Sequence, residues 1–305
     1  MRFVPALLLS VAVLSGCNRE PGSTNITRGA VVVGCDNAVL PVMQREVARF
    51  KELYKEADVT LRPMEGRVAV ASFANDSVRV IVTARPFNKE ERDSLGAAKI
   101  QFDEYKVALS AVAVIAHKDN PLTKVRLSQL DSIFTGNLTT WPGRRKSYIE
   151  VVIGGLNSSV NEVFRAAVLH GKAFSPAATP IDTSEKLIAY VMRTPHAIGI
   201  VDVGWLKEVP GDLDVMSVGS PGWQPDSTQP PGQYYSHAQA YVFQLYYPVT
   251  TPVYMYSREI SRDLALGFIS FVSGPQGQQI ILSSGLVPVT QPVRLVSLTS
   301  HQADH

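Results

Sequence analysis

The chain has 305 residues, is 45% hydrophobic and 18% charged, and carries a formal net charge of +2. This composition is typical of a folded globular protein and excludes a disordered one, and the length suffices for two domains. The near-neutral charge predicts no broad basic surface for nucleic acid, so a small anion would have to be bound by local geometry.

The N-terminus predicts an export signal. Arg2 precedes the apolar run Val4–Leu14, which is too short to span a membrane as a helix. Leu14-Ser15-Gly16-Cys17 follows and resembles the lipobox of bacterial lipoproteins, in which the cysteine is lipidated. We therefore expect residues 1–16 to be a signal peptide; a plain signal with an incidental cysteine is the alternative.

Residues 17–28 are rich in small and polar residues and predict a flexible tether that is lipid-anchored through Cys17. The mature protein would then lie in the periplasm or cell envelope and meet the membrane through its anchor only. Cys35 would have no disulfide partner and is expected to be a small buried packing residue, with a reactive thiol as the alternative.

Strands alternate with helices in the first part of the mature chain. The expected strands are Ala30–Val33, Val59–Met64 and Ser77–Thr83, and the expected helices are Val39–Lys55, Gly66–Asn75 and Asn88–Leu95. This alternation predicts an α/β fold with a largely parallel sheet. The extended run Ile100–His117, mostly apolar from Tyr105 to Ala116, is too long for one strand of a compact lobe, so we expect it to cross between two lobes.

The rest of the chain repeats the alternation less regularly. We expect a helix at Leu127–Phe134 capped near Ser128, a helix at Thr183–Arg193, a strand at His196–Val201, a surface excursion at Val209–Gly232, and helices at Ile260–Val272 and Gln276–Leu282. The aromatic segments Tyr241–Tyr247 and Val253–Tyr256 predict strands, broken by Pro248 and Pro252, that make a second crossing between the lobes.

The segment Val151–Leu169 carries the clearest functional signal. It is a short β-branched strand, a loop of small residues and an amphipathic helix that Asn157 or Ser158 can cap. Such a loop aims unpaired backbone N–H groups and hydroxyls at one point, which suits a phosphate, a sulfate or a carboxylate. The alternative is an ordinary strand–loop–helix connection.

Four segments together resemble a known family: Leu127–Trp141, His196–Val201, Tyr247–Tyr256 and Phe268–Pro288. They are similar to the PstS-like phosphate-binding lipoproteins of ABC importers, in a divergent branch of the periplasmic binding protein superfamily. The resemblance extends from about Gly29 to Val289.

The resemblance implies the type II periplasmic binding protein fold, an α/β fold of two lobes with mixed sheets and two crossing strands as the hinge. Lobe I is expected to comprise residues 29–107 and 246–293, and lobe II residues 108–245. The lobes would close over inorganic phosphate or a related oxyanion, which is delivered to the membrane subunits of an ABC importer. The resemblance implies no cofactor, metal or catalytic residue, and we expect a monomer.

The family's anion contacts come from three loops, and carrying them over implies a binding site made of Asp36, Asn37, Thr83, Ala84, Arg85, Asn157, Ser158 and Ser159. Asp36 has two interpretations, as an acceptor for the proton of a protonated phosphate or as a helix N-cap. Arg85 is either a ligand of the oxyanion or a solvated loop charge.

The third loop departs from the family pattern, because Gly154 stands where members carry an arginine and Val160 where they carry a threonine. The lost guanidinium removes a charge-assisted contact worth roughly 1.5–3 kcal/mol per hydrogen bond. Arg85 would compensate, the site would be weaker, or the ligand would differ.

The sequence thus favours a binding protein. The alternatives are a sensor or interaction protein that keeps the fold with another small ligand, and a secreted phosphatase-type enzyme. An enzyme has little support, because the chain contains no Gly-x-Ser-x-Gly and no His-Glu-x-x-His motif and its six histidines are scattered.

Overall fold

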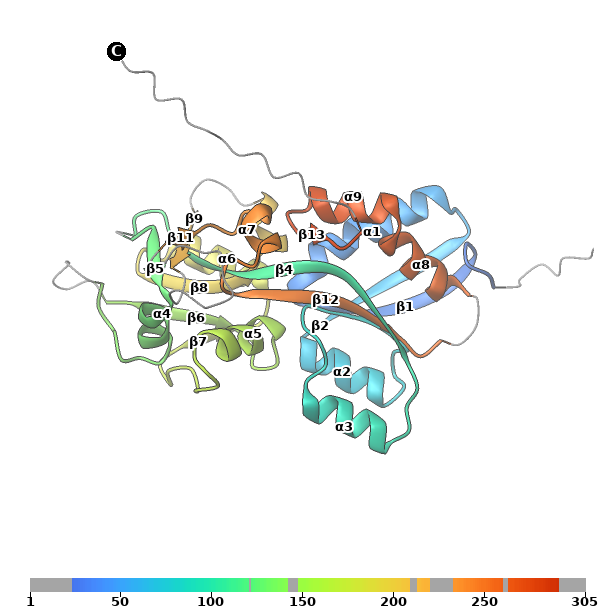
Figure 1. Cartoon of the computed structure of the whole chain (residues 1–305), viewed down its shortest axis with the longest axis horizontal. Coiled ribbons are helices and arrows are strands. Elements are labelled where there is room, and N and C mark those ends of the chain that lie inside the picture. The colour runs from blue at the N-terminus through green and yellow to red at the C-terminus, as the bar shows by residue number, and fades with distance from the viewer. Residues whose placement is uncertain are drawn as a thin grey trace, which may run out of the picture.

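The computed structural model of the chain describes residues 24–120, 122–141, 148–208, 213–219, 233–259 and 263–290. The predicted signal peptide, Cys17 and the predicted helix start at Ile260 lie outside these residues. A continuous mixed sheet with strand order β2-β1-β3-β12-β4-β8-β6-β7 runs through two lobes, as Figure 1 shows. This confirms the predicted two-lobed fold with crossing strands.

Parallel strands and their connecting helices build the first lobe. Its strands are β1 (Gly29–Asp36), β2 (Ala57–Met64) and β3 (Val80–Thr83), and its helices are α1 (Leu40–Leu53), α2 (Gly66–Ala74), α3 (Lys89–Ala97), α8 (Leu264–Ser273) and α9 (Pro275–Ser283). A short 3₁₀ turn, η1 (Asn37–Val39), joins β1 to α1. The ring of Phe50 on α1 packs edge-on against Phe268 and Phe271 of α8, which closes the core on one side of the sheet.

The second lobe repeats the same plan. Its parallel strands are β6 (Glu150–Gly154), β7 (Thr179–Ile181) and β8 (Ala197–Asp202); its helices are α4 (Leu127–Phe134), α5 (Ser159–Ala167), α6 (Ser184–Arg193) and α7 (Gln239–Phe243), with the 3₁₀ segment η2 (Val203–Glu208). A side sheet consists of β5 (Lys124–Arg126), β10 (Ser217–Gly219) and β11 (Tyr234–Tyr235). The short strands β9 (Leu213–Val215) and β13 (Val287–Pro288) pair with β4.

Two long strands connect the lobes. β4 (Asp103–His117) pairs with β12 (Thr250–Ser257) along its first part and with β8 from Val112 onwards. The prediction that Tyr105–Ala116 crosses between the lobes is therefore correct, and the second crossing is made by β12. The residue boundaries expected for the lobes stay a prediction.

The prediction of a strand at Tyr241–Tyr247 is wrong, because this segment contains α7 and a following turn. Its aromatic residues favoured a strand, yet here the rings of Tyr241 and Tyr246 pack around Tyr235 at 5.1 and 5.3 Å between centroids. Local propensity is overridden by this tertiary cluster.

Three smaller expectations also need correction. Pro252 lies inside β12 and does not break it; β3 pairs with β12 only from Tyr254 onwards, so the proline sits at an edge position where a missing N–H is tolerated. The helix α4 begins before Ser128, and the Gln129 side chain accepts from the backbone N–H of Arg126 at 2.9 Å. The described part of the predicted surface excursion contains β9 and β10.

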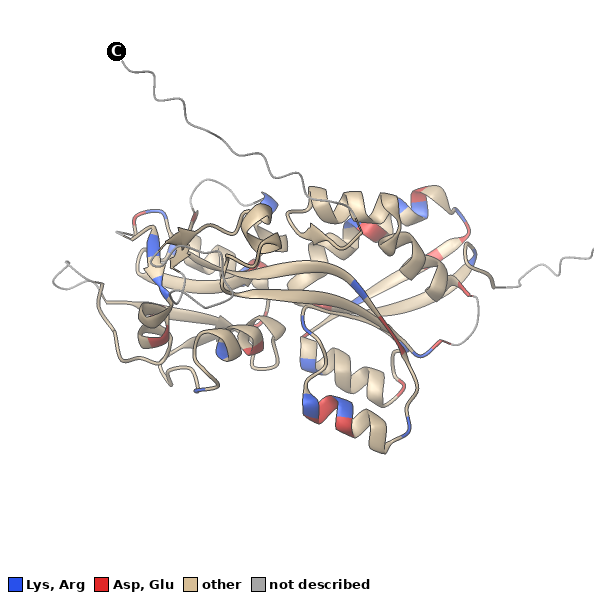
Figure 2. Ribbon diagram, viewed as in Figure 1, with Lys and Arg blue, Asp and Glu red and all other residues tan. Residues whose placement is uncertain are grey.

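Cys35 is fully buried, as predicted for a packing residue, and burial raises the pKa of its thiol. Basic and acidic residues are interspersed on α3, as Figure 2 shows. None of the helices within the described ranges is long and apolar enough to cross a membrane.

Glu46 on α1 generates a first prediction. It is fully buried, and neither carboxylate oxygen has a hydrogen-bond partner among the described residues, so burial raises its pKa to about 9. The unfolded chain releases this proton near pH 4.5, whereas the folded chain keeps it to about pH 9. The folded state therefore loses stability as pH rises through this window, by up to roughly 6 kcal/mol.

Replacing the buried carboxyl by a thioether of similar shape, Glu46→Met, should raise the free energy of unfolding, and the gain should grow from pH 4.5 to pH 9. Glu52→Met on the same helix is the control, because the Glu52 side chain is 62% exposed. Urea unfolding at several pH values measures both. A gain that is independent of pH would contradict the assignment.

Candidate functional site

The carboxylate of Asp36 is the point where the three predicted loops meet. Its Oδ1 accepts from the backbone N–H of Ala38 at 3.1 Å and so caps η1, which confirms the N-cap interpretation. Its Oδ2 accepts from the backbone N–H of Ala84 at 3.1 Å and from the hydroxyl of Ser159. Asp36 is 1% exposed, and burial raises its pKa although these three hydrogen bonds oppose the rise.

A second buried carboxylate, Asp202, was missed by the sequence reasoning. It ends β8, accepts from the Ser110 hydroxyl at 2.9 and 2.8 Å, and accepts from the Gly204 N–H at 2.8 Å. Burial raises its pKa to about 7, and the charge of nearby Asp36 adds to the effect. The available signal was an aspartate directly after the predicted strand His196–Val201, matching Asp36 at the end of β1.

The polar groups of the second loop are already bonded to other residues of the chain. The Thr83 hydroxyl donates to the backbone carbonyl of Arg85 at 2.7 Å. Arg85 is nearly buried and forms a bidentate pair with Glu91, at 2.8 and 2.7 Å. Its Nε forms an ion pair with Glu162 of α5. The guanidinium predicted to serve the oxyanion is thus neutralised by two glutamates in this conformation.

The third loop touches the first lobe through its backbone. The Asn157 N–H donates to Glu65 Oε2 at 3.3 Å, and the Asn157 carbonyl accepts from the Arg67 N–H at 3.1 Å. Ser158 is the N-cap residue of α5, but its hydroxyl makes no capping hydrogen bond.

The structure also explains why a glycine fits at position 154. A Cβ on Gly154 would lie 2.9 Å from the Ser158 hydroxyl, so a side chain at this position would require Ser158 to shift. The amide of Asn161 holds the loop instead, donating to the carbonyls of Gly154 and Gly155 at 2.8 and 2.9 Å. Asn161 on α5 is a positioning residue that the sequence pattern did not reveal.

A small pocket lies beside the convergence point. It is lined by groups from four loops and helix starts: Asp36, Asn37, Ala38, Glu65, Gly154, Gly155, Ser158, Ile181, Asp182, Thr183 and Ser184. Of the predicted site residues, it brings together Asp36, Asn37 and Ser158. Its free volume is about 10 Å³, roughly enough for one water molecule.

Two glycines make this close approach possible. A Cβ on Gly66, the first residue of α2, would lie 1.9 Å from the Ser159 Oγ and 3.0 Å from Asp36 Oδ2. A Cβ on Gly155 would lie 1.7 Å from the Glu65 Oε1. The lobes therefore meet in this structure at contacts that a side chain on either glycine would obstruct.

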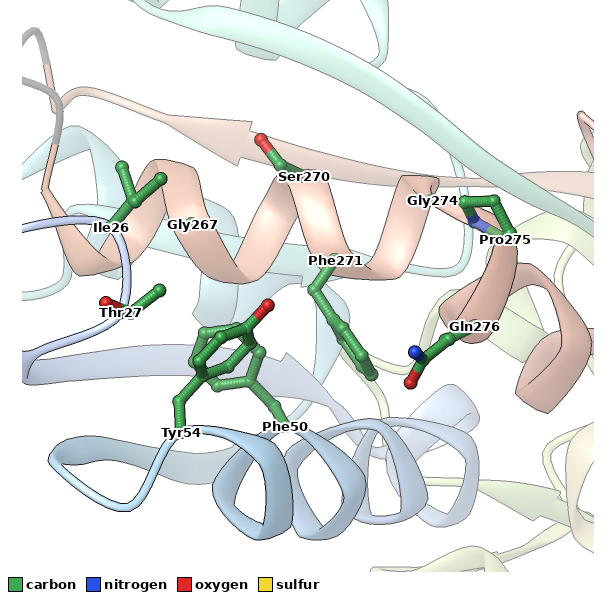
Figure 3. Close-up of a pocket in the computed structure, with 10 residues that line it drawn as sticks. All are labelled: Ile26, Thr27, Phe50, Tyr54, Gly267, Ser270, Phe271, Gly274, Pro275 and Gln276. Carbon is green, nitrogen blue, oxygen red and sulfur yellow. The ribbon is translucent and has the colours of Figure 1, made fainter.

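A larger cavity of about 630 Å³ adjoins the third loop and is lined in part by Arg67, Asn157 and Glu162. Figure 3 shows a groove of about 290 Å³ between α1 and α8, lined mainly by Ile26, Phe50, Tyr54 and Phe271. None of the predicted site residues lines it, and its aromatic surface does not suit an oxyanion. Within the described residues, no group of His, Cys, Asp or Glu side chains could hold a metal ion.

Comparison with known proteins places the chain in a structural context. A family model described as the PBP superfamily domain matches residues 21–275. Protein SphX of Synechococcus elongatus is 23% identical over 221 residues, which is 70% of this chain and 66% of SphX. Phosphate-binding protein PstS 2 of Streptococcus agalactiae is 23% identical over 41% of this chain and 40% of its own length. The chain thus spans less than two thirds of each of these curated relatives.

Solved structures agree on the fold. A protein from Clostridium perfringens with bound phosphate has a TM-score of 0.72 at 22% identity, covering 86% of this chain and 100% of that one. An ABC-type phosphate transport receptor from Vibrio cholerae has a TM-score of 0.63 at 15% identity, covering 84% and 99%. At this level of identity the likeness establishes the two-lobed architecture alone.

The glycine contact generates a second prediction. In Gly66→Ala the new methyl group should force the Ser159 hydroxyl away from Asp36, which costs about 1–3 kcal/mol for the unsatisfied buried group. Gly96→Ala is the matched control, because a Cβ there meets nothing within 4 Å in α3. Denaturant unfolding should show Gly66→Ala destabilised and Gly96→Ala unchanged or slightly stabilised; equal stability of the two variants would refute the contact.

Proposed function

We propose, from the premise that this chain belongs to the family of PBP superfamily domains, that it is an extracytoplasmic solute-binding protein. It captures inorganic phosphate or a related oxyanion between its lobes and delivers it to the membrane subunits of an ABC importer. The relatives named PstS and the structures of phosphate-transport proteins support this proposal.

The observation that carries the proposal is the meeting of three loops at Asp36. Loops that are 48 and 123 residues away from Asp36 in the sequence send the Ala84 N–H and the Ser159 hydroxyl to one carboxylate oxygen. When the lobes part, the Ser159 hydroxyl is released from Asp36, whereas the Ala84 N–H stays with Asp36 in the first lobe, and an oxyanion would enter between them. The first turns of α5 and α6 add backbone N–H groups beside the pocket.

A protonated oxyanion suits this site better than a fully ionised one. The Asp36 carboxylate is an acceptor and would repel a bare oxygen lone pair, whereas the O–H of hydrogen phosphate can donate to it. Sulfate carries no such proton at neutral pH. The Asp36 side chain is therefore the group that we assign to discriminate phosphate from sulfate, with Asn37, Ser158 and Ser159 as further ligands.

Thr83, Ala84, Arg85 and Asn157 keep the binding roles that the sequence predicts as part of this proposal. Ala84 would act through its backbone N–H. Arg85 is paired with both Glu91 and Glu162, and its bond to Glu91 remains when the lobes part. Arg85 would therefore contribute positive charge to the anion site only after its ion pair with Glu162 has separated.

Calorimetric titration tests the proposal. Phosphate should bind with a stoichiometry of one per chain and sulfate should give no heat. Ser158→Ala should weaken phosphate binding by about three- to tenfold, because it loses one neutral hydrogen bond, without changing stability, since this hydroxyl makes no capping bond. Ser128→Ala on the exposed side of α4 is the control. Absence of heat at millimolar phosphate would refute the assignment.

A second candidate keeps the fold with another small ligand, as a sensor or interaction protein. It is favoured by the neutralised Arg85 and by the carboxylates of Glu65 and Asp182 beside the pocket. A thermal-shift panel of anions, sugars and peptides separates the two, because a ligand that binds the folded state raises the melting temperature. A shift with a neutral ligand and none with phosphate would favour this candidate.

The proposed location depends on Cys17. If Cys17 is the lipidated residue, Cys17→Ala should move the protein from the membrane fraction to the soluble extracytoplasmic fraction. Cys35→Ala should leave it with the membrane, because that thiol is buried in the body of the protein. Immunoblots of fractionated cells measure both variants, and membrane retention of Cys17→Ala would exclude the lipid anchor.

A further inference from the structure

We propose that Glu162 is a latch that holds the two lobes together without a ligand, in a conformation that an entering anion must displace. The effect on anion binding rests on the proposed function. The closure itself depends only on side chains of this chain and can be tested separately.

Glu162 lies on α5 of the second lobe, and its carboxylate reaches two arginines of the first lobe. Its Oε1 accepts from Arg67 Nε at 2.6 Å, and its Oε2 forms an ion pair with Arg85 Nε. The side chains of Arg85 and Glu162 are only 6% and 16% exposed. Because little water screens this pair, its attraction is much stronger than that of an exposed ion pair.

Arg85, one of the two arginines that contact Glu162, is held in place by a residue of its own lobe. Glu91 of α3 accepts two parallel hydrogen bonds from Arg85. The Glu91 carboxylate also accepts from the backbone N–H of Asn88, which holds it at the start of α3. When the lobes part, Arg85 keeps Glu91, whereas Glu162 leaves both arginines. The ion pair of Glu162 therefore stabilises the closed arrangement and contributes nothing to an open one.

Other residues near Glu162 also form contacts between the two lobes. Ser159, three residues before Glu162 and on the same face of α5, donates to Asp36. The loop before α5 adds the backbone contacts of Asn157 with Glu65 and Arg67. Figure 1 shows α5 and α2 facing each other between the lobes. One face of one helix thus carries the interlobe contacts that lie nearest to the site.

This closed arrangement leaves no space for an oxyanion at Asp36. The pocket has a free volume of about 10 Å³, and the Ser159 hydroxyl already occupies the donor position on Asp36 Oδ2. Binding must therefore begin from a conformation in which the lobes have separated. The apparent affinity is then the intrinsic affinity multiplied by the fraction of molecules in that competent conformation.

Distance measurements between spin labels test the latch directly. Labels attached at Lys89 on α3 and Lys186 on α6 report the separation of the lobes, since both side chains are exposed, at 89% and 67%. The chain carries Cys17→Ser, and native Cys35 is fully buried. In phosphate-free buffer, Glu162→Gln should increase the population with a long interlabel distance about tenfold, and Glu185→Gln, the same change at an exposed position of α6, should leave it unaltered.

Arg67→Gln provides a second variant, because the Arg67 side chain is 48% exposed and its loss leaves the core intact. It should shift the distances in the same direction as Glu162→Gln, by a smaller amount. Unchanged distances in both variants would overturn the latch, whatever the protein binds.

Phosphate titration of the same proteins separates this inference from the proposed function. Severalfold tighter binding by Glu162→Gln is expected, because more molecules are competent to bind. If the distances shift and phosphate binds neither protein, the latch stands and the phosphate assignment fails. If the distances shift and Glu162→Gln binds phosphate more weakly, the closed arrangement aids the ligand and the inference is wrong.

Discussion

The hydrogen bonds to the Asp36 carboxylate connect all parts of the site. Two donors come from the first lobe, the N–H groups of Ala38 and Ala84, and one from the second, the hydroxyl of Ser159. A buried carboxylate is costly unless its oxygens are bonded, so these three donors must be in place when the lobes are closed. The ends of β1 and β3 and the start of α5 are consequently fixed relative to one another by a single side chain.

The fold and the position of this convergence point were accessible from the sequence. Asp36, Ala84 and Ser159 were located by the resemblance to the phosphate-binding family, whose anion contacts come from three loops, and the structure brings these three residues together. Glu65, directly before α2, and Glu162 on α5, in contrast, belong to segments whose patterns are those of ordinary amphipathic helices. Their roles arise from the docking of α5 against α2, and no local spacing encodes which face of one lobe meets the other.

Backbone groups at the start of two helices form hydrogen bonds across the lobes without a capping side chain of their own. Neither α2 nor α5 has a side-chain cap of its own. Instead the Asn157 carbonyl accepts from Arg67 at the start of α2, while the Glu65 carboxylate accepts from the Asn157 N–H just before α5. Each lobe thus satisfies polar groups of the other, which favours their contact, and an anion binding at α5 would have to replace the negative charge of Glu65.

The hydrogen bond between Ser110 and Asp202 bears on how the two lobes rotate relative to each other. Ser110 lies on β4 where this strand leaves β12 and begins to pair with β8, and its hydroxyl is bonded to Asp202. A carboxyl group that titrates near neutral pH therefore sits at the place where the two halves of the sheet join. Any bending there that admits water to Asp202 favours its ionised form, so rotation of the lobes and release of a proton are thermodynamically linked.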